Sequence, residues 1–191
     1  MKLARLEIIV IFVLLSYILY QHYLTYRNIE PIVSNVNGKT YQVQDLPDKQ
    51  EAADLLAQMH SNILKLMTHF KNDEFKNNKI VNRLFQRCNP SKIREGAYDP
   101  KYTSYTVNKG DEIVFCLRSR KINKFNKLHD INLLTFVCLH ELSHICNDTI
   151  GHDENFHNIF EYLLKEARKI NLYKPVNLSE VEYCGLNVNV F

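Results

Sequence analysis

The chain has 191 residues, of which 46% are hydrophobic and 24% are charged, and it contains five glycines, five prolines and no tryptophan. These proportions are typical of a folded protein and exclude disordered, collagen-like and low-complexity chains. The formal net charge is only +3, and part of that excess lies in the first 27 residues, so charge does not indicate a nucleic-acid-binding protein. Five cysteines at irregular spacings, with no CxxC pair, indicate neither a disulfide framework nor a cysteine-rich zinc site, and we expect mostly buried apolar thiols.

An uncharged segment covers residues 8–26, close to the start of the chain. A helix of that length spans roughly 28 Å, close to the thickness of the hydrocarbon core of a bilayer. The side chains at residues 20–23, towards the end of this segment, are too large for the cleavage site of a signal peptide. We therefore predict a transmembrane anchor at residues 1–27, contact of residues 8–26 with a lipid bilayer, and a single-pass membrane protein.

Prolines, a glycine and a polar run make residues 28–47 a predicted linker, with one short extended piece at 41–43. From residue 48 onward the pattern is that of a folded domain, which we place at 48–191. Apolar residues recur at helical spacing over 48–71, and a second helix is predicted over 73–87.

The middle of the chain has the composition of a β-hairpin. Residues 102–107 and 113–117 are rich in β-branched and aromatic side chains, and an Asn-Lys-Gly turn separates them. Helices follow over 130–147 and 153–170, and residues 183–190 can return as a strand. The predicted fold class is α+β, a small antiparallel sheet packed with helices.

The third predicted domain helix contains His140-Glu-Leu-Ser-His144, an HExxH motif. Residues four apart lie on one helical face, so both imidazoles can bind the same ion, and Zn²⁺ is the metal that this pattern favours. Glu141 can then act as the general base toward a water on that ion. The composition gives about 0.02 such motifs by chance, and the surrounding residues are uncharged, so these three polar groups need a partner such as a metal.

A zinc site needs a third protein ligand, and His152 is the preferred candidate. Gly151 before it permits a sharp reversal after the motif helix, and Asp153 after it is a good N-cap for the next helix. Other residues downstream stay open as alternatives: Asp153, Glu154, His157, Glu161 and Glu166.

The two histidine elements, His140-Glu-Leu-Ser-His144 and Gly151-His152-Asp-Glu-Asn-Phe156, resemble the SprT/WLM group of small zinc metallopeptidases. The stretch from residue 173 to 185 is similar to WLM-like proteins of large DNA viruses. The resemblance implies a zincin-like domain in which His140, His144 and His152 bind zinc, Glu141 is the catalytic base, and the substrate is a protein or peptide. Together with the predicted anchor, the resemblance also implies that the protein is located in a host or virion membrane.

Other polar residues receive weaker predictions. A basic run between the hairpin and the motif helix is more typical of a solvated loop than of a nucleic-acid contact; it comprises Arg118, Arg120, Lys121, Lys124 and Lys127. Tyr173 or Tyr183 can donate to an oxyanion, although packing is the favoured role for both. His60 and His69 are expected to be exposed.

The sequence therefore predicts a membrane-anchored zinc metallopeptidase. One alternative is a non-catalytic zinc-containing structural or interaction protein, which has no need of Glu141. Another is a protease for DNA–protein crosslinks, the activity of cellular members of the group. The predicted anchor departs from those members, so nucleic acid is disfavoured as a partner.

Overall fold

The computed structural model describes residues 2–99, 102–175, 177 and 181–188. Its helices are α1 (Lys2–Tyr26), α2 (Lys49–His69), α3 (Lys79–Arg87), α4 (Ile131–Cys146) and α5 (Glu154–Lys169), with short 3₁₀ helices at Asp73–Phe75 and Ile122–Lys124. Its strands are β1 (Ile29–Val33), β2 (Thr40–Gln44), β3 (Ile93–Glu95), β4 (Tyr105–Val107), β5 (Glu112–Phe115), β6 (Glu182–Tyr183) and β7 (Leu186–Asn187).

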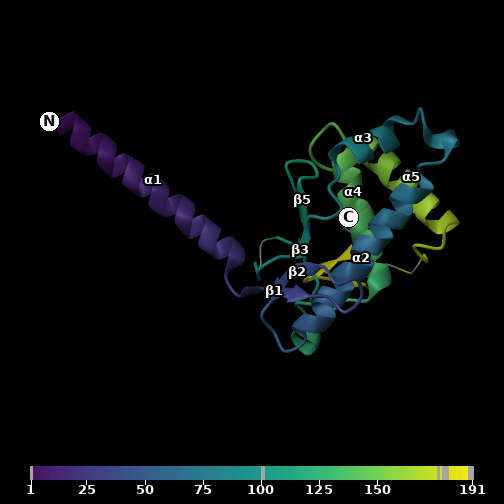
Figure 1. The fold of residues 1–191 in the computed structure, drawn as a ribbon, viewed down its shortest axis with the longest axis horizontal. Coiled ribbons are helices and arrows are strands. Elements are labelled where there is room, and N and C mark those ends of the chain that lie inside the picture. Colours follow the sequence, from purple (N-terminus) through teal and green to yellow (C-terminus); the bar gives the residue numbers. More distant parts are fainter. Residues whose placement is uncertain (1, 100–101, 176, 178–180, 189–191) are drawn as a thin grey trace.

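Helix α4, which carries the HExxH motif, lies at the centre of the domain and packs against α2, α3 and α5 (Figure 1). All of its residues from Leu133 to Cys146 except His144 are buried, which is typical of a helix enclosed by other elements. The carboxylate of Asp130 accepts the N–H groups of Asn132 and Leu133, both at 3.0 Å, and so fixes the first turn. The predicted start and end of this helix are correct to within one residue.

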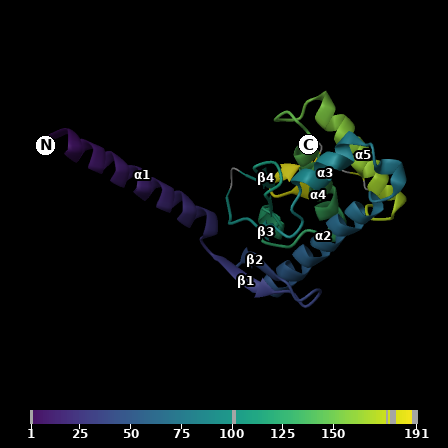
Figure 2. The same ribbon diagram turned by 45° about the horizontal axis from the view of Figure 1, so that its top comes forward.

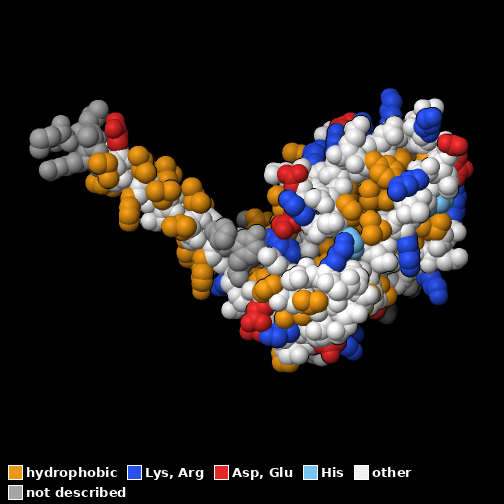
Figure 3. All heavy atoms as spheres, viewed as in Figure 1, with side chains coloured by type: hydrophobic (Ala, Val, Ile, Leu, Met, Phe, Trp, Pro, Cys, Tyr) orange, Lys and Arg blue, Asp and Glu red, His pale blue; other side chains and the backbone are white. Residues whose placement is uncertain are grey.

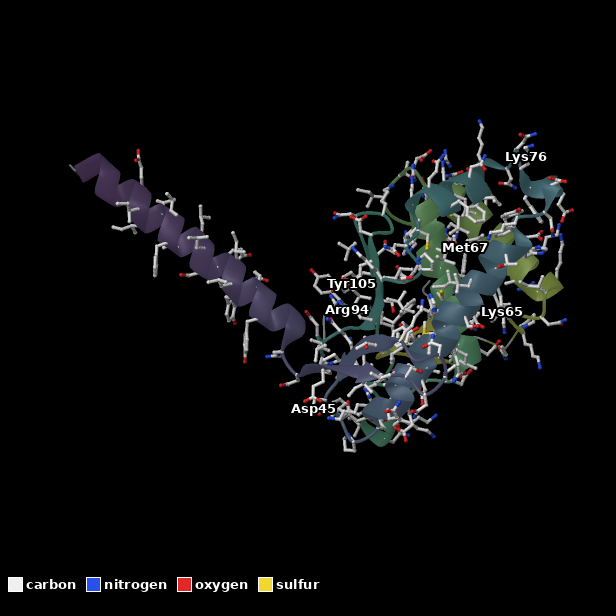
Figure 4. The ribbon with its side chains drawn as sticks, in the orientation of Figure 1. Asp45, Lys65, Met67, Lys76, Arg94 and Tyr105 are labelled. Carbon is white, nitrogen blue, oxygen red and sulfur yellow. A yellow bond between two sulfur atoms is a disulfide. The ribbon has the colours of Figure 1, made fainter. Side chains whose placement is uncertain are left out.

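The helices around α4 also follow their predicted patterns. α2 buries one face, which includes Leu56, Ile63 and Leu66. α3 is shorter than predicted, because Asn78 caps a new helix by accepting the N–H groups of residues 80 and 81 and separates it from the 3₁₀ turn before it. Figure 4 shows Lys65 and Met67 on α2, with Asp45 near its beginning and Lys76 beyond its far end.

The central sheet has the strand order β3-β5-β4. β4 and β5 form the predicted antiparallel hairpin, with Tyr105 opposite Val114. β3 runs parallel to β5, with Ile93 opposite Ile113, so the sheet is mixed and the prediction of an antiparallel sheet is wrong. The β3 strand has only three residues, two of them charged, and therefore lacks the alternation that identifies a strand.

The C-terminal segment forms a small hairpin of β6 and β7. A disulfide between Cys116 and Cys184 ties this hairpin to the end of β5. The expectation that the cysteines are buried thiols is therefore wrong for these two, while Cys88, Cys138 and Cys146 are free and buried as expected. Residues 189 and 190 of the predicted strand lie outside the described residues.

The segment predicted as a linker, residues 28–47, instead contains the antiparallel hairpin of β1 and β2. This hairpin packs on α2 and beside β3. Tyr41 and Val43 point into the core and are 3% and 0% exposed. The extended piece at 41–43 was predicted, and its burial makes the segment part of the folded domain.

Helix α1 projects away from the other elements (Figures 1 and 2), and its large apolar side chains from Ile8 to Tyr20 are exposed (Figure 3). Across the part of the chain that the structure describes, no helix combines the length and the apolar character that crossing a membrane requires. The predicted anchor at 1–27, the bilayer contact of 8–26 and the single-pass membrane location are therefore wrong. The prediction rested on residues 8–26 being uncharged and on an apolar run over residues 8–20 that only Ser16 interrupts, and the polar Gln21 and His22 follow that run.

Candidate metal centre

Three histidine side chains converge at the end of α4. His140 and His144 lie one turn apart on the helix, and His152 approaches them from the loop between α4 and α5. The Nε2 atom of His140 is 3.2 Å from that of His144 and 3.1 Å from that of His152, and the remaining separation is 3.2 Å. Tetrahedral zinc with Zn–N bonds of about 2.05 Å separates neighbouring nitrogens by about 3.3 Å, so the triangle has the dimensions of three zinc ligands.

The protonation of these histidines also suits a metal. Burial, together with the neighbouring imidazoles, lowers the pKa of His140 to about 3 and that of His144 to about 4. Burial also lowers the pKa of His152. The three rings are therefore neutral at pH 7, and a neutral imidazole offers the nitrogen lone pair that a metal needs. Since three mutual Nε2 contacts cannot all be hydrogen bonds of good geometry, a shared cation fits this donor set better than hydrogen bonding does.

Phe156 forms the floor beneath the three rings. Its ring centroid lies 4.9 Å from that of His140, 4.4 Å from that of His144 and 4.7 Å from that of His152. Phe156 is fully buried and belongs to the first turn of α5. The side chain therefore restricts how far each imidazole can tilt.

Glu141 follows the first histidine on α4 and is only 4% exposed. Burial raises the pKa of this carboxyl group to about 8, because a charged carboxylate loses its hydration there. A cation held by the adjacent histidines would lower that pKa again and favour the carboxylate. The site thus combines three nitrogen ligands with a buried acid whose proton affinity depends on the local charge.

The loop from α4 to α5 brings His152 back to the motif helix. Gly151 has a φ of +93°, a conformation that costs glycine little and other residues more. Asp153 then caps α5 by accepting the N–H of Phe156 at 2.8 Å and also accepts the amide of Asn147 at 3.0 Å. The reversal and the cap predicted from the sequence are both present.

The other candidates for a third ligand lie elsewhere. Asp153 acts as the helix cap, and Glu154, His157 and Glu161 are exposed on α5. Glu166 pairs with His69 at 2.9 Å and with Lys169 at 2.7 Å. Within the described ranges, only His140, His144 and His152 form a group of possible metal ligands.

Several weaker predictions are corrected by the structure. His60 is 3% exposed beside Tyr41, and His69 is largely buried against Glu166, so the expectation that both are exposed is wrong. Tyr173 and Tyr183 are buried at 3% and 0% exposure, which agrees with packing. Arg118 of the basic run is buried in ion pairs with two carboxylates rather than presented to solvent.

The sequence reasoning did not identify Arg83, Arg87 and Lys109, which hold backbone carbonyls at the end of α4. The spacing of Arg83 and Arg87 places them on one face of α3, and this was the available signal. Their target lies about sixty residues further along the chain, so local pattern could not name it.

Comparison with known proteins identifies the family. The family model described as WLM domain matches residues 35–187. The uncharacterized protein R325 of Acanthamoeba polyphaga mimivirus is 38% identical over 165 residues, 83% of this chain and 81% of that protein. The uncharacterized protein 136R of Invertebrate iridescent virus 6 is 38% identical over 93 residues, 49% of this chain and 48% of that protein.

Solved structures also align with the chain. The crystal structure of Wss1 from Saccharomyces cerevisiae covers 68% of this chain and 86% of its own, with a TM-score of 0.46 and 19% identity. A Wss1 mutant gives a TM-score of 0.49 at 20% identity, covering 69% of this chain and 91% of its own. The family match and the viral relatives, rather than these distant structures, confirm the resemblance found in the two histidine motifs. The chain belongs to the WLM domain family and is a WLM-like protein of large DNA viruses.

Proposed function

We propose that this WLM protein is a zinc-dependent peptidase that hydrolyses peptide bonds in protein or peptide substrates. The observation that carries the proposal is the convergence of three neutral imidazole nitrogens at 3.1–3.2 Å next to the buried Glu141. Membership of the WLM family supports it, since the same two histidine motifs resemble those of small zinc metallopeptidases.

The donor set favours zinc over the harder cations. Imidazole ligands suit Zn²⁺, whereas Mg²⁺ and Ca²⁺ take oxygen ligands. Structural zinc sites use four protein ligands, while catalytic sites use three and keep one position open. The described residues supply three ligands, which favours a catalytic zinc site over a structural zinc site.

When bound, zinc would polarise the scissile carbonyl and lower the pKa of water to about 7. The carboxylate of Glu141 takes a proton from the attacking water as the water oxygen bonds to the carbonyl carbon. Glu141 then gives that proton to the amine nitrogen as the C–N bond breaks, and the second proton of the water stays on the new hydroxyl, so the products are a carboxylic acid and an amine. Burial raises the pKa of Glu141 and a bound cation would lower it again, so the two effects together favour a carboxylate that can accept a proton and return it.

The test compares the full-length protein with Glu141→Gln and a control, Glu161→Gln, which alters an exposed glutamate on α5. The zinc content per chain is measured by mass spectrometry, and the peptidase activity is measured with denatured casein as substrate. We expect Glu141→Gln to retain zinc and to lose at least about 100-fold in activity, and Glu161→Gln to behave as wild type. Equal activity in wild type and Glu141→Gln would contradict the proposal, as would a wild-type protein that binds zinc without cleaving.

The same assay with added DNA distinguishes the crosslink-protease alternative. Of the predicted basic run, Arg118 is occupied by Asp48 and Glu95, while Lys121, Lys124 and Lys127 are exposed. A general peptidase cleaves equally with and without DNA, whereas a protease that acts on DNA-bound proteins is stimulated by it.

A further inference from the structure

We propose that Arg83, Arg87 and Lys109, together called the carbonyl clamp, position His152 for metal binding. The inference rests on the metal site of the proposed function and assigns a role to residues outside it. These side chains come from α3 and from the turn between β4 and β5, and all three reach the segment that connects α4 to His152.

The carbonyl clamp holds five successive backbone carbonyls, those of residues 145–149. Arg83 donates to the carbonyl of Cys146 at 3.3 Å, and Arg87 donates to those of Ile145 at 3.1 Å and Asn147 at 3.3 Å. The Nζ atom of Lys109 donates to the carbonyls of residues 147, 148 and 149 at 2.9, 2.6 and 3.1 Å. The last carbonyls of a helix have no partner within the helix, so the carbonyl clamp satisfies groups that would otherwise be left to solvent.

The side chain of Asp148 adds a second attachment. Its carboxylate pairs with Arg87 at 2.9 Å and also with Arg83. The guanidinium groups of Arg83 and Arg87 therefore bind the carboxylate of Asp148 as well as the backbone carbonyls of the residues just before it. This arrangement fixes the direction in which the chain leaves α4.

Besides the carbonyl clamp, side-chain hydrogen bonds restrain the segment, because the carboxylate of Asp153 accepts the amide of Asn147 at 3.0 Å and the hydroxyl of Thr149. Residues 148–152 are all exposed, and Ile150, its one large apolar residue, is 94% exposed. Hydrophobic burial therefore cannot hold this part of the loop in place. Its position depends on the carbonyl clamp on one side and on the cap formed by Asp153 on the other.

The turn that presents Lys109 is itself packed backbone to backbone on α3. A Cβ added at Gly110 would lie 2.4 Å from the carbonyl oxygen of Arg87, so only glycine permits this approach. The N–H of Asn89 donates to the carbonyl of Gly110 at 3.0 Å. Lys109 and Arg87 are thus held in fixed relation to each other before they reach the loop.

The charge of Lys109 and its positioning role have opposite effects on metal binding, so a substitution can distinguish them. The positive charge of Lys109 acts on His144, so it opposes the binding of a second cation by the histidines. If charge were its main effect, removing it would tighten metal binding. If positioning is its main effect, removing it weakens metal binding even though the repulsion is gone.

The experiment measures the zinc Kd by competition with a chromophoric chelator, and the visible absorption of the Co²⁺-loaded protein as a report on ligand geometry. The variants are Lys109→Met, Lys109→Arg, Arg87→Met and His152→Ala, with Lys165→Met on the exposed face of α5 as the matched control. Circular dichroism of the metal-free proteins shows which variants fold.

We expect Lys109→Met to raise the zinc Kd about tenfold, in the range seen when groups that orient a ligand are lost, and to change the Co²⁺ spectrum. Lys109→Arg should recover part of the loss, since a guanidinium keeps the positive charge and several N–H donors, and Lys165→Met should match wild type. If Lys109→Met fails to fold, Arg87→Met makes the same test, because it also removes a positive charge. An unchanged or lower Kd in the folded clamp variant overturns the inference. A wild-type protein without zinc affinity, or a His152→Ala variant that binds as wild type, would instead overturn the metal site.

Discussion

Arg118 joins two distant parts of the domain through carboxylates on either side. Its Nη1 atom lies 2.6 Å and 2.7 Å from the two carboxylate oxygens of Asp48, just before α2, and its Nε atom lies 2.8 Å from Glu95 on β3. The side chains of Arg118 and Glu95 are 4% and 0% exposed. Glu95 also accepts the N–H of Gln44 at 2.7 Å, so the same carboxylate attaches the β1–β2 hairpin.

Replacing Arg118 with methionine keeps much of the apolar stem and leaves Glu95 buried without its cation. Removing one partner of a buried ion pair costs about 3–5 kcal/mol. Burial already raises the pKa of Glu95, while Arg118 lowers it in part, so the variant raises that pKa further. For a urea m value of about 2 kcal/mol/M, the unfolding midpoint falls by roughly 2 M.

Urea unfolding of Arg118→Met, Glu95→Gln and the double variant measures the coupling between the two groups. A neutral amide still accepts from Gln44, so the double variant should recover more than half of the loss. Arg120→Met is the control, because its guanidinium donates only to the exposed carbonyl of Tyr102 among the hydrogen bonds described, and should cost about 1 kcal/mol.

The pH dependence of Arg118→Met follows from the raised pKa of Glu95. A carboxyl group with a folded pKa above its unfolded value contributes stability below the unfolded pKa and loses it as the pH rises through the folded one. The deficit of Arg118→Met should therefore be smaller at pH 4.5 than at pH 7.5. An equal deficit at both values, or a double variant as unstable as the sum of the single ones, would refute the reasoning.

Three further predictions concern the site and its surroundings. In metal-free protein, the free energy of unfolding of Glu141→Gln should rise relative to wild type as the pH increases from 5 to 8, by up to about 1.4 kcal/mol per pH unit. The reason is that burial raises the pKa of Glu141 to about 8. An equal difference between the urea midpoints of the two proteins at both pH values would contradict this. Replacing Cys116 and Cys184 by serine opens a loop of 68 residues and should lower the free energy of unfolding by up to about 4 kcal/mol. A dithiol reductant should likewise lower the melting temperature of wild type. A melting temperature that does not change with reductant would argue against the disulfide. Phe156→Ala should lower the free energy of unfolding by about 3–5 kcal/mol and weaken zinc binding, since the ring is fully buried beneath the three histidines; an unchanged urea midpoint would show that the ring does not support the site.

The features predicted well from the sequence have local causes. The motif helix α4 has an N-cap at Asp130 and an apolar run at residues 136–139 before the motif, so its ends could be predicted. His152 could be chosen because Gly151 and Asp153 beside it are the residue types that a reversal and a helix cap require. The proximity of His152 to His140 then followed from two helices joined by a short loop.

The features that were missed depend on contacts between distant residues. Arg118 lies in a run of basic residues and was interpreted as part of a solvated loop, whereas it pairs with Asp48, 70 residues earlier, and with Glu95, 23 residues earlier. Cys116 and Cys184 are 68 residues apart, and no spacing rule pairs them. The anchor was predicted from an uncharged segment and its apolar run over residues 8–20, after which Gln21 and His22 are polar.

The most direct test of the three-histidine metal site is X-ray absorption spectroscopy of the zinc-loaded protein. The account predicts three imidazole ligands at about 2.0–2.1 Å and one oxygen donor from solvent, with no sulfur ligand, and two imidazoles in His152→Ala. Sulfur scattering at about 2.3 Å, or an unchanged imidazole count in His152→Ala, would contradict it.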